Sequence, residues 1–278
     1  MLPPRIYAAA ITPRGKQFEI DYGAAFELID FLCRAGVHGI ALFTTAGEYG
    51  ALRSEDRSRL VYLAVKRSRV PLLAGVGSAT LDDSVKLGRE ARDTGAAGLL
   101  LPPPYFFHYE QDDLREFCVQ FAMQVEGVPV YLVRTAALCA DTAAALLATG
   151  RFAGVVEEAG GSFGWAKGHE VLAGEDGGLR QGLDGGASGA VSAAACAIPE
   201  LVLALAGGAA VDELLREFLD WMKRAPWPVM LKAAVRGRGL KTGPEGAALS
   251  AERLRSVSEF AAWFHGWLPS VKGLSARA

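Results

Sequence analysis

The sequence predicts a closed (β/α)8 barrel, because short apolar runs alternate with amphipathic stretches and eight such runs can be counted. Strands that alternate with helices indicate a parallel sheet. The chain has 278 residues, of which 51% are hydrophobic and 22% are charged, and this is the ordinary balance of a folded globular protein. A barrel of about 250 residues folds as one unit, so one large domain accommodates most of this length.

Eight segments have the length and apolar character of strands. They lie at residues 6–10, 39–43, 71–74, 98–101, 129–133, 154–157, 170–172 and 189–191. Eight strands with intervening helices is the number that closes a barrel. An open doubly wound sheet usually has fewer strands and a glycine-rich phosphate-binding loop after the first one, and no such loop follows Ala10.

Paired glycines mark four turns that lead from a helix into the next strand. The first glycine of a pair takes a left-handed conformation that ends the helix, and the second lets the chain pass close to its neighbours. The interval between Gly150 and Gly186 is compressed, so the helices after the sixth and seventh strands are expected to be only a turn or two long. The pairs are Gly36 and Gly39, Gly95 and Gly98, Gly150 and Gly154, and Gly186 and Gly189.

The barrel is expected to occupy residues 1–207, and residues 208–278 are expected to form helices packed on it. Three amphipathic stretches follow Gly207, at residues 211–223, 226–236 and 251–266. They exceed what eight strand–helix units need. The fold is therefore predicted to be a (β/α)8 TIM barrel with a C-terminal helical extension.

Charge and cysteine usage exclude several classes of partner. The 29 basic and 31 acidic residues give a net charge of −2, so no strong field gathers nucleic acid or an anionic membrane. No apolar run approaches the roughly 20 residues of a membrane span, and the first residues lack a signal-peptide pattern. The four cysteines include no C-x-x-C pair, which favours free thiols in a reducing compartment. We expect a cytoplasmic protein with a small-molecule partner.

The working groups of such a barrel lie at the carboxyl ends of its strands. Threonine hydroxyls there hydrogen-bond a carboxylate or cap the loop, and an arginine binds a carboxylate bidentately or pairs with a neighbouring glutamate. Adjacent glutamates act as a general base, hold a cation or are merely solvated; no histidine supports a metal ion, and no cofactor is expected. The candidates are Thr44, Thr45, Arg134 and Val191 for substrate binding and Glu157, Glu158 and Tyr105 for catalysis.

Five segments together resemble the dihydrodipicolinate synthase and N-acetylneuraminate lyase superfamily, a group of pyruvate-handling lyases. Residues 8–13 and 70–77 are similar to its first and third strands, 42–52 to its glycine–threonine–threonine–glycine–glutamate segment, 104–106 to its proline–tyrosine–tyrosine loop and 229–234 to a C-terminal helix. The resemblance implies a 2-oxo acid substrate and a homodimer or homotetramer in which Tyr105 passes between subunits. It also implies that Glu48 is structural and holds backbone amides in its loop.

The resemblance fails at the positions that carry the chemistry of the family. Members usually attach pyruvate to a lysine at the end of strand six, because an iminium acidifies the neighbouring carbon. That position falls on Val156, or on Glu157 if one residue is inserted. The proton-relay tyrosine falls on Val133, the arginine that holds the substrate carboxylate has no clear counterpart, and the nearest lysine is Lys167.

Two functions remain open at this point. In the first, the protein is a divergent enzyme that binds a small oxo acid or related carboxylate and enolises or dehydrates it, with Glu157 or Glu158 as the base and without an iminium. In the second, it binds such a carboxylate without catalysis, or it regulates an active paralogue. Both hypotheses place the ligand in the barrel mouth.

Overall fold

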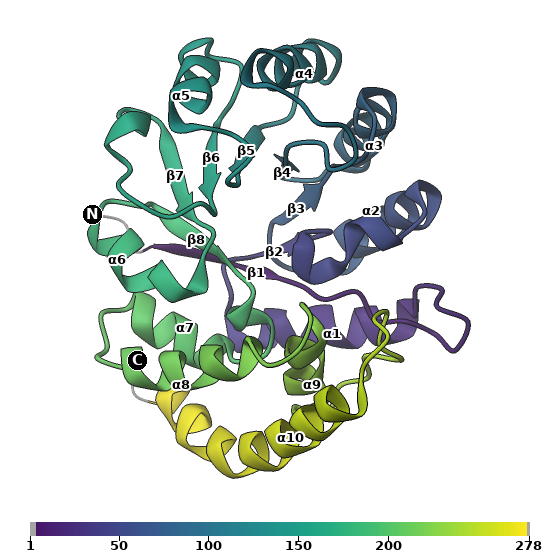
Figure 1. Ribbon diagram of the computed structural model, residues 1–278, viewed down its shortest axis with the longest axis vertical. Coiled ribbons are helices and arrows are strands. Elements are labelled where there is room, and N and C mark those ends of the chain that lie inside the picture. The colour runs from purple at the N-terminus through teal and green to yellow at the C-terminus, as the bar shows by residue number, and fades with distance from the viewer. Residues whose placement is uncertain (1–3, 277–278) are drawn as a thin grey trace.

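The computed structural model describes residues 4–276, and its centre is a closed barrel of eight parallel strands (Figure 1). Each strand pairs with the next one along the chain, and β8 pairs with β1 to close the barrel. The predicted fold class is confirmed. The strands are β1 (Arg5–Ala9), β2 (Gly39–Leu42), β3 (Leu72–Gly75), β4 (Gly98–Leu101), β5 (Val130–Arg134), β6 (Gly154–Glu157), β7 (Glu170–Ala173) and β8 (Gly189–Ser192).

Two strands begin one residue later than predicted, and in both cases a proline precedes the strand. Pro71 and Pro129 have no backbone N–H, so they cannot donate to the strand ladder. Their carbonyl groups still accept hydrogen bonds, from the Ile40 amide at 3.0 Å and from the Leu99 amide at 2.8 Å. These prolines therefore mark the entry to β3 and β5 without interrupting the barrel.

Helices α1 to α7 surround the strands (Figure 1). The connections after β6 and β7 are as short as the compressed glycine interval predicted. A single 3-10 turn (Gly164–Ala166) follows β6, and another (Asp176–Gly178) leads into the six-residue α6. The helices are α1 (Tyr22–Ala35), α2 (Ser54–Arg67), α3 (Leu81–Thr94), α4 (Gln111–Gln124), α5 (Ala140–Ala148), α6 (Leu179–Asp184) and α7 (Pro199–Ala206).

Helix α3 illustrates how local sequence sets these elements. The Thr80 hydroxyl accepts a hydrogen bond from the Asp83 amide at 3.3 Å, which satisfies one free N–H at the start of the helix. Gly95 ends the helix with a φ of 94°, a left-handed conformation that glycine adopts without strain. Val85 and Ala91 are among the residues on the face that is buried against the barrel.

The second glycine of each pair allows close packing of neighbouring strands. A Cβ atom at Gly189 would lie 2.1 Å from the Arg5 carbonyl oxygen, and one at Gly154 would lie 2.3 Å from the Glu170 carbonyl oxygen. Real Cβ atoms do not approach backbone oxygens this closely. The closing contact between β8 and β1 therefore depends on glycine at position 189.

Three helices follow α7 and form a layer beside α1 and α7 (Figure 1). They are α8 (Asp212–Met222), α9 (Val229–Gly237) and α10 (Ala251–Lys272). Phe218 of α8 packs against Phe260 and Phe264 of α10, and all three rings are buried. Helix α8 also contacts the 3-10 turn after β7, so this layer reaches the carboxyl ends of the strands.

Two further properties concern membranes and disulfides. Within residues 4–276, no helix is both long enough and apolar enough to cross a lipid bilayer. The four cysteines are free thiols, and Cys118 and Cys196 are buried.

We expect Gly189→Ala to lower the free energy of unfolding by at least about 2 kcal/mol, because the added Cβ forces β8 away from β1. The matched control is Gly266→Ala, on the exposed face of α10, where the added Cβ meets nothing within 4 Å. That change is expected to stabilise the protein by up to about 1 kcal/mol, since alanine favours a helix over glycine. Urea unfolding followed by circular dichroism measures both, and equal effects would contradict this account of barrel closure.

Candidate active site

Two adjoining cavities open at the carboxyl ends of the strands. The first, here named the β4 cavity, has a volume of about 220 Å³ and an apolar lining that includes Leu100, Phe43 and three prolines of the loop after β4. The second, the α8 cavity, has a volume of about 430 Å³ and extends beneath α8. Four residues line both cavities: Thr44, Thr45, Glu158 and Val191.

The cavities bring together most of the residues that the sequence proposed for the site. Thr44, Thr45, Glu158 and Val191 stand between the two cavities, and Tyr105 lines the β4 cavity. Val133 and Val156, the positions where the resemblance expects a tyrosine and a lysine, also line the β4 cavity. Glu157 and Arg134 line neither cavity.

Arg134 and Glu157 bind each other, which is one of the two alternatives that the sequence left open. The Arg134 Nε donates to Glu157 Oε2, and Arg134 Nη2 donates to the Gly160 carbonyl at 3.2 Å. The other carboxylate oxygen of Glu157 accepts from the Ala159 amide at 2.8 Å. Only 12% of the Arg134 side chain and 2% of the Glu157 side chain are exposed. Both groups are therefore occupied with each other and with the backbone.

Glu158 faces the cavities because successive side chains of an extended segment point to opposite sides. Its side chain passes over Gly174, where a Cβ atom would lie 2.6 Å from Glu158 Cγ. Burial, assisted by the negative charge of Glu157, raises the pKa of Glu158 to about 7. At neutral pH this carboxyl group is present in both forms, so it can donate or accept a proton in the barrel mouth.

Thr44 presents a hydroxyl group that lacks a partner. Its Oγ1 is buried and makes no hydrogen bond to any other part of residues 4–276. A buried hydroxyl without a partner is unfavourable by about 1–3 kcal/mol, and a ligand oxygen at the junction of the cavities would satisfy it. Thr44 and Glu158 thus supply two polar groups to one place in the site.

Tyr49 is a site residue that the sequence reasoning did not single out. It lines the β4 cavity, and its ring meets that of Tyr105 edge to face with centroids 5.8 Å apart. Burial raises the pKa of Tyr49, and Tyr105 and Glu158 add to the rise. The guanidinium group of Arg57 lies over the ring of Tyr49, with its Cζ 5.4 Å from the ring centroid. The only signal in the sequence was its place directly after Glu48 in the segment 42–52.

Lysine is almost absent from the two cavities. No lysine or arginine lines the β4 cavity among the described residues. Lys223 reaches the α8 cavity, but three quarters of its side chain is exposed and its ammonium group lies 2.7 Å from Asp220 Oδ1. Lys167 is exposed and lines neither cavity.

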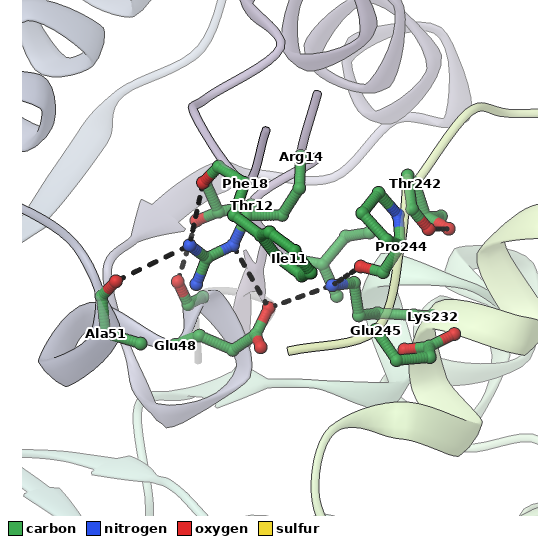
Figure 2. Close-up of polar contacts among 12 residues, drawn as sticks. Ile11, Thr12, Arg14, Phe18, Glu48, Ala51, Lys232, Thr242, Pro244 and Glu245 are labelled. Atoms are coloured by element: carbon green, nitrogen blue, oxygen red, sulfur yellow. Dashed lines mark hydrogen bonds and ion pairs between the residues drawn. The ribbon is translucent and has the colours of Figure 1, made fainter. Parts of the chain in front are cut away.

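A buried ion pair behind the cavities holds the loop that carries Thr44, Thr45 and Tyr49. Glu48 has a left-handed backbone with a φ of 54°, and its Oε2 accepts from Lys232 Nζ of α9 at 3.0 Å (Figure 2). Lys232 is completely buried and also donates to the Pro244 carbonyl at 3.3 Å. The resemblance implied that Glu48 holds backbone amides, whereas the observed partner of its carboxylate is a lysine of the C-terminal layer.

Residues of the segment that follows β1 hold the same loop. Arg14 Nε lies 3.9 Å from Glu48 Oε2, and Arg14 Nη1 donates to the Ala51 carbonyl at 3.4 Å (Figure 2). The Thr12 hydroxyl donates to the Gly47 carbonyl at 2.8 Å. The loop is therefore anchored by charged and polar contacts before any ligand arrives.

The fold and site define the class of protein: a (β/α)8 barrel with its polar groups gathered at the carboxyl ends of the strands, where barrel proteins place their sites. Residues 3–245 match the model of the dihydrodipicolinate synthetase family. The chain belongs to this family.

Individual relatives agree with this assignment. The 4-hydroxy-tetrahydrodipicolinate synthase of Symbiobacterium thermophilum is 28% identical over 271 residues, which cover 86% of this chain and 89% of the relative. The structure of the 4-hydroxy-tetrahydrodipicolinate synthase of Methylacidiphilum fumariolicum superposes with a TM-score of 0.84 at 25% identity and covers 99% of both chains. The sialic acid aldolase of Ruminococcus gnavus shares the fold. Its structure superposes with a TM-score of 0.85 at 20% identity and covers 96% of this chain and 99% of the aldolase.

Within residues 4–276, no group of three or more histidine, cysteine, aspartate or glutamate side chains is arranged to hold a metal ion.

We expect Lys232→Met to lower the free energy of unfolding by about 3–5 kcal/mol, because it leaves the Glu48 carboxylate without its nearest cation in a buried place. The double variant with Glu48→Gln as well is expected to recover only part of this loss, since it removes the unpaired carboxylate but also takes that carboxylate from the buried Arg14. Lys223→Met, which removes an exposed ion pair, should stay close to the parent protein. Urea unfolding measures all three, and a double variant no better than Lys232→Met would argue against the ion pair as the cause.

Proposed function

We propose that this protein is a divergent lyase-family barrel that binds a small 2-oxo acid or related carboxylate without a covalent bond and enolises it, with Glu158 as the proton-transfer group. Its relatives include proteins named as 4-hydroxy-tetrahydrodipicolinate synthases and a sialic acid aldolase. The observation that carries the proposal lies at the carboxyl end of β6. There Val156 contributes an apolar wall where the resemblance expects a lysine, and Glu158 contributes a carboxyl group two residues later.

The remaining side chains of the site support chemistry without an iminium. Lys167 and Lys223 are both exposed, and neither lines the β4 cavity, so neither places an amine beside Val156. Val133 cannot relay protons, and Arg134 is engaged by Glu157. The groups left to recognise a carboxylate are the hydroxyls of Thr44 and Thr45 together with Glu158 in its acid form.

The proton transfers of an enolisation balance with a single carboxyl group. Glu158 in its acid form donates its proton to the ketone oxygen of the ligand, whose C=O π electrons move to that oxygen. The resulting carboxylate removes a proton from the adjacent carbon, and the electrons of the broken C–H bond form the C=C bond of the enol. Glu158 ends in its acid form, so no other reactant is needed. A pKa near 7 suits both halves of this exchange.

We also propose that the protein is a homodimer or homotetramer. The loop after β4 exposes three aromatic side chains in a row, with exposed fractions of 54% for Tyr105, 73% for Phe106 and 53% for Phe107. Contiguous exposed apolar groups favour burial against another surface, and a second copy of the chain fits the relation of Tyr105 to the family loop. A monomeric mass by light scattering would contradict this proposal.

The first test is the exchange of pyruvate methyl protons in D2O, followed by proton NMR. We expect exchange with the parent protein and at least a hundredfold slower exchange with Glu158→Gln, which cannot transfer a proton. Borohydride added to a parallel sample should leave the intact mass unchanged, with a lysine-bearing relative as the positive control. A pyruvyl adduct would overturn the proposal. Binding without exchange would support the alternative of a non-catalytic carboxylate binder.

The second test concerns pH. A bound anion raises the pKa of Glu158 further, because a negative charge disfavours ionisation of the carboxyl group. Since the free group is about half ionised at pH 7, binding should take up about half a proton at that pH. Affinity should therefore fall as the pH rises from 6 to 8. Calorimetry in buffers of different ionisation enthalpy measures the uptake.

The matched variants are Glu158→Gln and Glu175→Gln. The first is expected to bind pyruvate with no proton uptake over this range, while the second, which removes an exposed carboxylate at the edge of the α8 cavity, should keep the uptake. An affinity that increases with pH would show that Glu158 binds the ligand in its ionised form, contrary to the proposal.

A further inference from the structure

The α8 cavity is larger than a three-carbon oxo acid needs. Its volume is about 430 Å³, compared with about 220 Å³ for the β4 cavity. The two cavities adjoin at Thr44, Thr45, Glu158 and Val191, which line both. A ligand whose reactive carbons lie beside Glu158 can therefore extend into the α8 cavity.

The wall of the α8 cavity that α8 and its neighbours supply is apolar. Phe218, Leu219 and Met222 come from α8, Trp227 from the segment that follows it, and Leu231 from α9. Phe218 and Leu231 are buried, whereas 45% of Trp227 is exposed. An apolar ligand group placed here would remove both its own surface and that of Trp227 from water, which is the main source of apolar binding energy.

Apart from Thr44, Thr45 and Glu158, where the two cavities adjoin, and the exposed Glu175, the polar side chains of this cavity are already engaged. Asp176 accepts hydrogen bonds from the Ala194 amide at 2.8 Å and from the Ser192 hydroxyl. Lys223 is paired with Asp220 at 2.7 Å. Neither group requires a ligand hydroxyl to complete its hydrogen bonds, so the cavity offers little to a polyhydroxylated tail.

We propose that the α8 cavity is a subsite for an extended apolar tail, so that the preferred ligand is a 2-oxo acid with an aliphatic or aromatic side chain. The placement of the oxo-acid head rests on the function proposed above. The tail subsite rests on its own observations, namely that Glu158 lines the α8 cavity as well as the β4 cavity and that α8, Trp227 and Leu231 build an apolar wall there.

The experiment is calorimetric titration with a homologous series: pyruvate, 2-oxobutanoate, 2-oxopentanoate and 2-oxohexanoate. Each methylene that enters an apolar site is expected to tighten binding by up to about fourfold. A six-carbon 2-oxo acid with a hydroxylated tail should bind no better than pyruvate. The subsite would be overturned by an affinity that does not change with chain length, or that is highest for the hydroxylated tail. In either case, binding of pyruvate would leave the proposed function standing. Failure of every oxo acid to bind would overturn both.

Two substitutions test the location of the tail. Leu219→Trp fills the α8 cavity and is expected to abolish the increase in affinity with chain length. Its affinity for pyruvate should stay within about twofold of that of the parent protein. The control is Leu214→Trp, on the same helix and also partly buried, because Leu214 lines neither cavity. Trp227→Ser removes an exposed residue of the apolar wall with less risk to folding. It should reduce the increase in affinity per methylene by at least half. If affinity increases with chain length in both Leu219→Trp and Trp227→Ser as much as in the parent protein, the tail lies elsewhere and the proposal is overturned.

Discussion

The pairing of β8 with β1 closes the barrel, and the site depends on that closure. Parallel strands in a closed ring bring all eight carboxyl ends to one mouth, so side chains that are distant in sequence converge there. Val191 of β8 and Thr44 after β2 consequently line the same cavities. The closure requires glycine at position 189, because the Arg5 carbonyl oxygen occupies the space that any Cβ atom would need.

The alternation of side chains along β6 separates two neighbouring carboxyl groups into different roles. Glu157 is almost fully buried and has Arg134 and a backbone amide as partners. Glu158 lies beside the cavities, and burial raises its pKa. The ion pair of Glu157 thus contributes to structure, and its residual negative charge assists in keeping Glu158 partly protonated.

Most of the fold could be predicted from the sequence, because paired glycines and short apolar runs are local signals. Thr44, Thr45 and Glu158 could be placed at the mouth for the same reason, since each directly follows an expected strand. Other features depend on contacts that no local pattern records. Glu48 and Lys232 are 184 positions apart. Tyr49 directly follows Glu48, so its place in the site depends on a loop that this distant ion pair holds.

The valine at position 156 and the carboxyl group at position 158 are physically linked. A lysine at 156 beside a carboxylate at 158 would form an ion pair, which raises the pKa of the lysine and suppresses its nucleophilicity. A lysine that must attack a carbonyl group needs the opposite shift. With valine at 156, the same carboxyl group has an apolar neighbour and its own pKa rises to about 7. The two residues therefore fit the proposed proton transfer by a carboxyl group, and the same pair would not suit the Schiff-base chemistry that the resemblance implies.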